Sequence, residues 1–494
     1  MCVHAWSDAC DHVLVNVLAI DQGTSATKAL VVSPERGVLA EAEAPVHPRS
    51  VAGSGVEQDP EELWSSVLEA GKAAVAQAGG TVDAVGLANQ GETVLAWDRA
   101  TGRALSTALS WQDRRAATVC ERLADRGAEL EQRTGLPLDP YFAAPKITWL
   151  REHVTTAGVA STTDAWLLAR LTAGRAYATD AATASRTLLL DLDRVEWSPE
   201  ACAAFGVEPE LLPTVVGCAE PVGETAAFGP SIPVAGLAVD QQAALFAEAC
   251  LSAGEAKCSY GTGAFLLTTV GGTPRRSSNG LVGCVAWRLG TQTTWCLDGQ
   301  VYTVGAAVRW LAEVRLVDEA ADLDRVGGQV DTPGGVAFVP GLAGLGAPFW
   351  RPSAKGAFVG LSLGTTRAHL VRAVVEGVAA QVAWLARAAG DDLGRPLQRL
   401  RVDGGLTRSA VLMQVQADLL QAPVEVYPSP NATALGVAAL ARLGAGQATD
   451  PAEVTGGWAP VATYEPLVSA DEADSRLDRW RQVAEATLRL EGPA

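Results

Sequence analysis

The stretch Asp21-Gln22-Gly23-Thr24-Ser25 follows directly on the apolar run Val13–Ile20. In the second half of the chain, Tyr260-Gly261-Thr262-Gly263 repeats the same order of apolar strand, Gly-Thr turn and apolar strand. Each stretch predicts a β-hairpin whose tight turn points backbone N–H groups and a hydroxyl into a small concavity that suits an anion. Two such turns, one in each half of the chain, indicate that a polyphosphate binds between two domains.

Asp21 and Asp240 are the carboxylates best placed to act on that phosphate. Asp240 follows the predicted strand Pro233–Val239 and precedes the amide side chain of Gln241. Phosphoryl transfer needs a metal ion, donors that spread the developing charge, and a carboxylate that takes the hydroxyl proton. We therefore expect Asp240 to be the general base and Asp21 to serve the metal. The alternatives are that Asp240 caps the helix predicted at Gln241–Cys250 and that Asp21 is a turn residue.

The length of 494 residues exceeds what one hydrophobic core supports, so we expect two large domains. Small residues at Ser252-Ala253-Gly254 precede the second hairpin and favour a boundary near residue 250. The expected division is a disordered extension at 1–12, an N-terminal domain at 13–250 and a C-terminal domain at 251–494.

Composition excludes several classes of function. The net charge of −18 and the pI near 4.8 argue against nucleic acid or an anionic membrane as a partner. The nine cysteines are odd in number and include no C-x-x-C pair, which favours buried thiols in a reducing cytoplasm. The five histidines form no cluster, so neither zinc chemistry nor Ser-His catalysis is indicated.

A short buried strand, Val82–Ala88, ends at the polar loop Asn89-Gln90-Gly91-Glu92-Thr93. Ligand-binding groups gather at the carboxyl ends of strands in open α/β sheets, so this loop is a second candidate for the site. The sequence also predicts a helix that begins after Asp59 and helical stretches around Ala116–Glu131.

These motifs, taken together, resemble the FGGY carbohydrate kinases, and within that family the glycerol kinases. The resemblance covers nearly the whole chain beyond residue 16. It is carried, besides the stretches already quoted, by Trp111-Gln-Asp-Arg-Arg115, Asp139-Pro-Tyr-Phe142, Ala184-Ser-Arg-Thr187, Ala235-Gly-Leu-Ala-Val-Asp-Gln-Gln-Ala243, Gly346-Ala-Pro-Phe-Trp350, Arg401-Val-Asp-Gly-Gly405 and Thr433-Ala-Leu-Gly436.

The resemblance implies an α/β fold of two ribonuclease-H-like (actin-like ATPase) domains, with ATP, Mg²⁺ and the acceptor in the interdomain cleft. It implies that Asp21 helps to hold Mg²⁺. The residues implied to face the phosphates are Thr24, Ser25, Lys28 and Thr262, and those implied to surround the adenosine are Gly305, Arg309, Gly405 and Ser409. Arg309 and Ser409 depart from the Gln and Asn that are usual in the family. From the residue alone, Lys28 can also be a solvated charge at a strand end.

For the acceptor, the resemblance implies Glu92, Tyr141, Asp240 and Gln241, all of which match the family. The arginine that the family places beside the glutamate is absent, and Gly91 stands there instead. Losing a guanidinium removes charge-assisted hydrogen bonds and leaves room for a side chain. We therefore expect an acceptor that is larger than glycerol, such as a longer polyol or a ketose.

Two other interpretations remain open at this stage. An actin-like ATPase or nucleotide-gated binding protein would share the fold without an acceptor site, and the aromatic residues Trp111, Tyr141 and Phe265 argue against it. A catalytically inactive homologue is disfavoured by Asp21 and Asp240. We expect a cytoplasmic enzyme that binds a small polyol or sugar, contacts neither nucleic acid nor membrane, and forms a homodimer or homotetramer.

Overall fold

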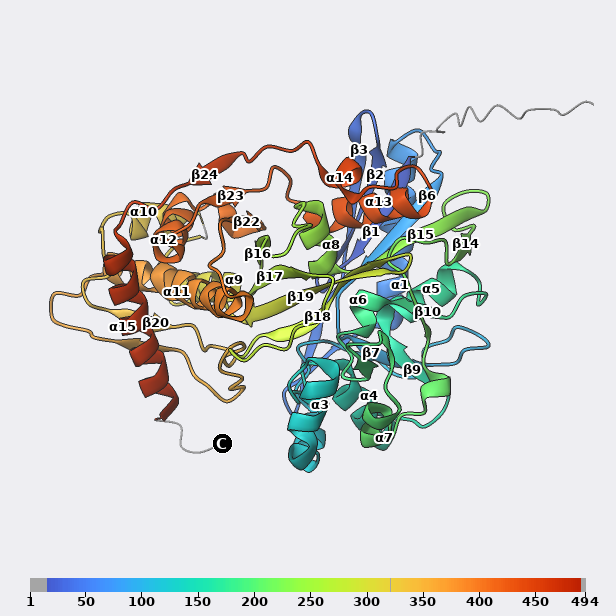
Figure 1. Ribbon diagram of the computed structural model, residues 1–494, viewed down its shortest axis with the longest axis horizontal. Helices are drawn as coiled ribbons and strands as arrows, with labels where there is room; N and C mark the ends of the chain where they lie inside the picture. Colours follow the sequence, from blue (N-terminus) through green and yellow to red (C-terminus); the bar gives the residue numbers. More distant parts are fainter. Residues whose placement is uncertain (1–15, 320, 490–494) are drawn as a thin grey trace, which may run out of the picture.

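The computed structural model describes residues 16–319 and 321–489; the extension expected at 1–12 lies outside the described residues. The chain forms a mixed α/β structure with two sheet-rich domains, as the sequence predicts (Figure 1). The N-terminal half lies on the right of Figure 1 and most of the C-terminal half on the left.

The N-terminal sheet has six strands in the order β14-β15-β6-β1-β2-β3. β1 and β2 form the predicted hairpin, β6 pairs parallel with β1, and β15 pairs parallel with β6. The carboxyl ends of β1, β6 and β15 therefore lie side by side at one edge of the sheet. The bounds are β1 Val17–Gln22, β2 Ala26–Ser33, β3 Gly37–Pro45, β6 Ala84–Asn89, β14 Gly223–Thr225 and β15 Ile232–Val239.

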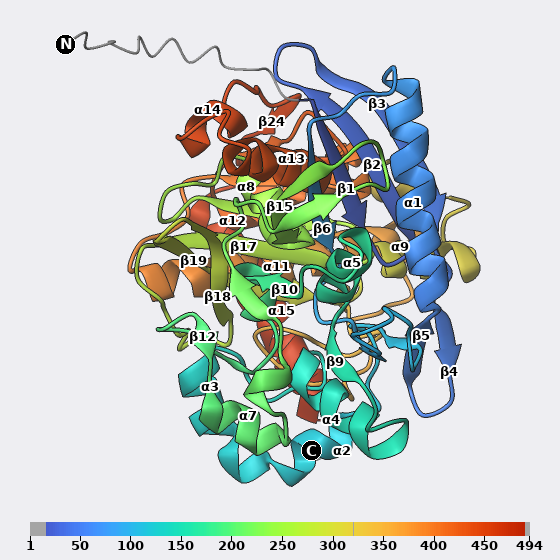
Figure 2. The ribbon, with the colours of Figure 1, turned by 90° about the vertical axis from the view of Figure 1, so that its right-hand side faces the viewer.

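Helices cover both faces of this sheet, which explains why β1 is apolar at successive positions. Helix α1 (Pro60–Gln77) packs on the face that carries Leu18 and Ile20. It begins as predicted, because the carboxylate of Asp59 accepts a hydrogen bond from the N–H of Glu61 at 2.9 Å. Figure 2 shows α1 on one side of the sheet, with α8 (Asp240–Ala247) and α13 (Ala432–Gly444) on the other.

The position of α13 ties the two halves of the chain together. This helix comes from the C-terminal half, yet it packs against β1, β6, β15 and α8. Its backbone approaches α8 so closely that a Cβ at Gly436 would lie 1.8 Å from the carbonyl oxygen of Ala243. Only glycine permits this contact.

The C-terminal sheet has seven strands in the order β18-β19-β17-β16-β22-β23-β24. The second predicted hairpin is β16–β17. The bounds are β16 Ala256–Tyr260, β17 Ala264–Gly271, β18 Val282–Leu289, β19 Gln292–Val301, β22 Leu400–Asp403, β23 Val424–Val426 and β24 Ala462–Tyr464.

The helices of the C-terminal half are α9 Gly305–Glu313, α10 Asp322–Gly327, α11 Arg367–Leu393, α12 Ala410–Leu420, α14 Pro451–Thr455 and α15 Ala470–Arg489. Helix α11 alone, among the described residues, is long and apolar enough to cross a membrane. Of its most apolar window, 72% is buried inside the protein, so α11 is a core helix.

A smaller five-stranded sheet, in the order β4-β5-β8-β7-β9, lies below the N-terminal sheet in Figure 1. Its bounds are β4 Arg49–Val51, β5 Gly55–Gln58, β7 Val94–Trp97, β8 Ala108–Leu109 and β9 Val159–Thr162. The helices around it are α2 Ala117–Arg122, α3 Gly127–Thr134, α4 Ala143–His153, α5 Thr163–Leu171, α6 Ala181–Ala184 and α7 Pro199–Phe205.

Helical stretches form around Ala116–Glu131, as the sequence predicts, but a break at Leu123 divides them into α2 and α3. The N–H of Leu123 is shared between the carbonyls of Val119 and Cys120, which tightens the last turn of α2. A 3₁₀ turn follows at Ala124–Arg126, and α3 starts at Gly127, a residue of low helix propensity.

Candidate active site

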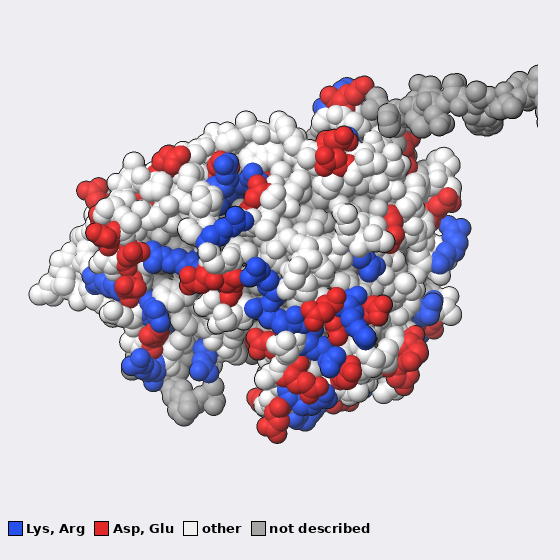
Figure 3. Space-filling view, viewed as in Figure 1, with Lys and Arg blue, Asp and Glu red and all other residues white. Residues whose placement is uncertain are grey.

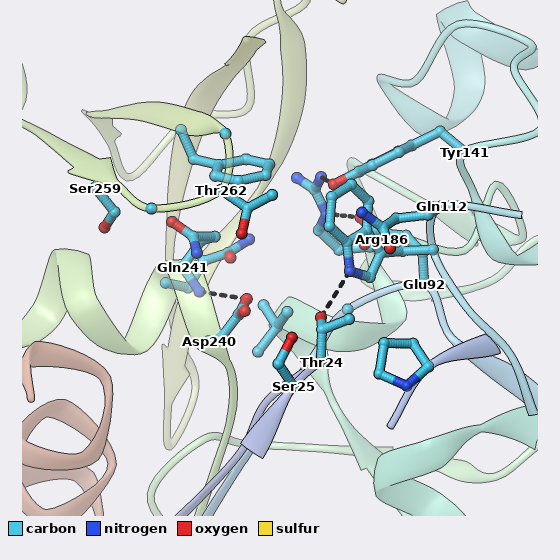
Figure 4. A pocket seen from close by; sticks show the side chains of 18 of the residues that line it. Thr24, Ser25, Glu92, Gln112, Tyr141, Arg186, Asp240, Gln241, Ser259 and Thr262 are labelled. Carbon is cyan, nitrogen blue, oxygen red and sulfur yellow. Dashed lines mark hydrogen bonds and ion pairs between the residues drawn. The ribbon is translucent and has the colours of Figure 1, made fainter. Parts of the chain in front are cut away.

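A cavity of about 450 Å³ lies where the two hairpin turns face one another. Both halves of the chain line it, and Figure 4 shows Asp240 and Gln241 with Thr262 on one side and Thr24, Glu92 and Arg186 on the other. The other lining residues are Ser25, Pro48, Gly91, Trp111, Gln112, Tyr141, Val239, Gln242, Ser259, Gly261, Gly263, Phe265 and Arg309.

The first turn is closed by the N–H of Gly23, which donates to the carbonyl of Ala26 at 3.0 Å. The hydroxyl oxygen of Thr24 accepts a hydrogen bond from the indole N–H of Trp111 at 2.9 Å. The second turn is closed by the N–H of Gly261, which donates to the carbonyl of Gly263 at 2.9 Å. Thr24, Ser25 and Thr262 thus come to one cavity from separate sheets, as the sequence predicts.

Asp240 is the first residue of α8, and the helix cap is Val239, so Asp240 does not serve as the cap. Its Oδ1 accepts a hydrogen bond from the N–H of Gln241 at 2.7 Å. Burial raises the pKa of Asp240 above its usual value, while this hydrogen bond and the ammonium of Lys257 oppose the shift. The carboxylate is therefore a stronger base than an exposed aspartate.

Asp21 lies opposite Lys28 in the β1–β2 hairpin, beside the cavity rather than among its lining residues. Burial first, and then the negative charge of Asp240, raise the pKa of Asp21 to about 7, and Lys28 lowers it. The Nζ of Lys28 lies 3.5 Å from Oδ1 of Asn431. The structure thus places Lys28 near Asp21 and not on the wall of the cavity.

The surroundings of Asp21 fit a magnesium ion. Desolvation and then the negative charge of Asp240 raise the pKa of Asp21, and an added cation would relieve that repulsion. Across residues 16–319 and 321–489, no group of three or more His, Cys, Asp or Glu side chains forms a metal site. Mg²⁺ needs no such group, because it commonly binds one or two carboxylates, water and substrate phosphates.

The end of the cavity where the acceptor is expected is built around Glu92, Tyr141 and Arg186. Glu92 has φ of +57°, in the left-handed region that glycine favours, so its backbone is strained at the site. Arg186 donates through Nε to the carboxylate of Glu92 and lies 3.4 Å through Nη2 from the phenolic oxygen of Tyr141. Burial raises the pKa of Glu92, and the guanidinium of Arg186 opposes this shift.

Three rings enclose the space above these polar groups. The indole of Trp111 lies edge-on to Tyr141, with ring centroids 5.9 Å apart, and to Phe265, with centroids 6.0 Å apart. The three aromatic residues singled out in the sequence therefore gather at one cavity. Apolar rings beside a few convergent polar groups are typical of a small-molecule site.

The residues expected around the adenosine are only partly brought together. Arg309 lines the cavity, whereas Gly305, Gly405 and Ser409 do not. Gly305 packs on the second turn, where its N–H donates to the carbonyl of Gly261 at 3.0 Å. The hydroxyl of Ser409 donates to the carboxylate of Asp324 and accepts from the N–H of Leu412, so it caps α12.

Sequence reasoning assigned no role to three buried charged residues at the site. Lys257 donates to Oε1 of Gln241 at 2.6 Å and to the hydroxyl of Ser259 at 2.7 Å. Arg186 also donates to Asp298, which lies on β19 in the other half of the chain. The nearest available signal was Asp298, which follows the apolar run Trp295-Cys296-Leu297, because a buried charge is retained only with partners.

Comparisons with known proteins agree with this geometry. The N-terminal domain profile of the FGGY family of carbohydrate kinases matches residues 16–247, and the C-terminal domain profile matches residues 256–445. The chain belongs to the FGGY family of carbohydrate kinases. It is therefore an ATP-dependent kinase, and the interpretation as an actin-like ATPase without an acceptor is not favoured.

Among FGGY relatives, the glycerol kinase of Bordetella parapertussis is 41% identical over 498 residues, covering 97% of this chain and 98% of the relative. The glycerol kinase of Thermus brockianus is 42% identical over 484 residues, covering 95% of this chain and 98% of the relative. The crystal structure of Plasmodium falciparum glycerol kinase with ADP superposes with a TM-score of 0.88 at 28% identity, covering 96% of this chain and 98% of that chain. A xylulose kinase from Rhodospirillum rubrum shares the fold, with a TM-score of 0.84 at 24% identity, covering 97% of this chain and 99% of that chain.

Proposed function

We propose that this enzyme transfers the γ-phosphoryl group of ATP to a hydroxyl of a small polyol or sugar, with Asp240 as the general base. The observation that carries the proposal is the position of Asp240. Its carboxylate lies in one cavity with both Gly-Thr turns and with the acceptor-side residues Glu92 and Gln241. An acceptor held by Glu92, Tyr141 and Gln241 would thus have a base beside its hydroxyl and the phosphate-binding turns on either side.

The roles of the remaining residues follow from their places. Thr24, Ser25 and Thr262 would donate to the phosphates, and Arg309 would add a cation at the mouth of the same cavity. Gly305, Gly405 and Ser409 would lie further out, around the nucleoside. Lys28, which pairs with Asp21 in the hairpin, would lower the pKa of Asp21 and so favour its charged form.

Asp21 would bind Mg²⁺ together with the phosphates of the nucleotide. The ion supplies charge neutralisation to the transferring phosphoryl group. Asp21 must lose its proton to bind the ion, and Asp240 must lose its own to accept the proton of the acceptor hydroxyl. A bound cation would stabilise the two deprotonated carboxylates beside one another.

We propose further that the preferred acceptor is longer than glycerol, with four or five carbons. The support is Gly91, which leaves the wall beside Glu92 without the arginine expected there. Glycerol itself is the second candidate. It is favoured by the 41–42% identity to glycerol kinases and by the guanidinium that Arg186 already supplies to Glu92.

The deciding experiment compares kcat/KM for glycerol, erythritol, ribitol, xylitol and xylulose, with ADP release as the readout. A four- or five-carbon acceptor is expected to rank first. If glycerol ranks first, the longer-acceptor proposal is wrong and the enzyme is a glycerol kinase. ATP hydrolysis that none of these compounds stimulates would contradict the kinase assignment of the cavity.

We also propose a cytoplasmic homodimer or homotetramer that binds neither nucleic acid nor membrane. The seven cysteines among the described residues are free thiols, which suits a reducing compartment. Figure 3 shows Lys and Arg mixed with Asp and Glu on this face of the molecule, an arrangement that gives no basic patch there for a polyanion. Light scattering gives the molar mass in solution. A mass equal to that of one chain would contradict the proposed homodimer or homotetramer.

A further inference from the structure

Gly91 and Val239 lie against one another at the ends of two neighbouring strands. Val239 ends β15 and is the register partner of Asn89, the last residue of β6. Gly91 comes two residues later, and both Gly91 and Val239 line the acceptor end of the cavity. A Cβ at position 91 would lie 2.9 Å from Cγ2 of Val239, closer than real Cβ atoms come to a neighbour.

The contact with Val239, rather than the backbone, demands glycine at position 91. Gly91 is absent from the residues with positive φ, so its own conformation admits any side chain. The neighbouring side chain is what excludes one.

Val239 has little freedom to move away. Its side chain is branched at Cβ, which restricts χ1, and it is 2% exposed. It packs in the cluster that includes Ala88, Ala238 and Val437, and the next residue is Asp240. Moving Val239 would therefore disturb the base as well as the core.

We infer that Gly91 and Val239 act as one specificity element that gives the acceptor pocket an apolar wall. This inference rests on the proposed function and deepens it. The γ-methyl group of Val239 takes the place of a side chain at position 91, so an acceptor meets carbon there instead of a guanidinium. It follows that a cationic side chain cannot be accommodated at position 91 by replacing Gly91 alone, because Val239 must also be replaced by a smaller residue.

The test is a double-mutant cycle with Gly91→Ala, Val239→Ala and the double variant, measured by thermal unfolding. The added Cβ of Gly91→Ala is expected to lower Tm by several degrees, and the same change in the Val239→Ala background is expected to lower Tm far less. Val234→Ala is the matched control. It removes the same two methyl groups from a buried position of β15 in another cluster, and its effect should add to that of Gly91→Ala.

The second arm measures acceptor preference for Gly91→Arg with and without Val239→Ala. Gly91→Arg alone should lose at least tenfold in kcat/KM for every acceptor, and the double variant should recover activity and shift its preference toward glycerol. Additive Tm changes in the alanine cycle would overturn the inference, as would equal activity of Gly91→Arg in both backgrounds. If the parent enzyme phosphorylates no polyol or ketose, the proposed function fails, while the Tm cycle still decides whether Val239 excludes a side chain at position 91.

Discussion

The Nζ of Lys257 lies 2.6 Å from Oε1 of Gln241, so a buried ammonium on the C-terminal sheet holds an acceptor-side amide on α8. Because the same ammonium lowers the pKa of Asp240, it acts on the proposed base as well as on the amide beside it. We therefore expect Lys257 to act as a positioning residue that couples acceptor binding to proton transfer.

Replacing Lys257 with methionine tests this coupling. Gln241, which is half-buried, loses its partner. Leaving a fully buried polar group unpaired costs roughly 1–3 kcal/mol, so KM for the acceptor should rise toward the lower end of the corresponding ~5- to 150-fold range. The pKa of Asp240 should rise further, which moves the acid limb of the kcat/KM profile to higher pH. Lys72→Met, at an exposed position of α1, is the control. An unchanged acid limb would leave Lys257 with a packing role only.

Asp240→Asn removes the proposed base and keeps the shape of the side chain. Turnover should fall on the order of 10²–10⁴-fold while the thermal unfolding transition stays cooperative. Nucleotide binding, followed by fluorescence titration, should change much less than turnover. Turnover within a factor of a few of the parent enzyme would remove Asp240 from this role.

The pKa of Asp21 predicts how magnesium dependence varies with pH. The usual pKa of an aspartate is 3.8, and that of Asp21 in the folded protein is about 7. At a pH between these two values, the folded protein holds a proton on Asp21 that the unfolded chain has lost. The contribution of Asp21 to the free energy of unfolding therefore decreases as pH rises through this window and is constant above it.

Mg²⁺ must displace that proton, so the half-saturating Mg²⁺ concentration should fall up to ~10-fold per pH unit below pH 7 and level off above it. Activity titrations with Mg²⁺ from about pH 6 to about pH 8 measure this directly. Asp21→Asn should abolish the trend and weaken Mg²⁺ dependence throughout. A flat response in the parent enzyme would show that Asp21 is ionised across the range.

Arg186→Met leaves the carboxylates of Glu92 and Asp298 buried without their shared cation. Breaking a buried ion pair from one side costs roughly 3–5 kcal/mol, so Tm should fall markedly and kcat/KM for the acceptor should fall with it. Adding Asp298→Asn to Arg186→Met should recover part of the lost Tm, because one uncompensated charge is removed. A double variant no more stable than the single one would argue against this pairing.

Arg309→Gln introduces the residue that is usual in the family. If Arg309 faces the phosphates, KM for ATP should rise several-fold while KM for the acceptor stays the same, since one charge-assisted contact is lost. Arg36→Gln, at an exposed turn between β2 and β3, should change neither constant. An effect on the acceptor alone would place Arg309 at the other end of the cavity.

Local patterns in the sequence predicted the parts of the site that local chemistry determines. The two Gly-Thr hairpins, the strand end at Asp240 and the loop at Gly91 and Glu92 each depend on a short run of residues, and each forms as expected. The position of the break between α2 and α3 at Leu123 could not be predicted, because competing hydrogen bonds do not change the spacing of apolar residues.

The contacts that could not be predicted join residues far apart in the chain. Arg186 and Asp298 are 112 positions apart, and the residues around each of them in the sequence do not indicate that the two side chains pair. The contact between Gly91 and Val239 depends on the register of β6 against β15. A shift of one residue would turn the side chain of Val239 to the other face of the sheet. Such pairings are fixed by the assembled sheet and not by either segment.

The placement of α13 has a consequence for biosynthesis. The face of the N-terminal sheet that carries Val17 and Ala19 is covered by residues 432–444, which leave the ribosome after more than four fifths of the chain. Throughout that interval α8 can lie on this face of the nascent N-terminal half but α13 cannot, so part of the apolar face stays uncovered, and such a surface favours aggregation. A fragment that ends at residue 250 would keep this exposed face permanently, so the two halves of the enzyme should be made as one chain, or co-expressed, to obtain folded protein.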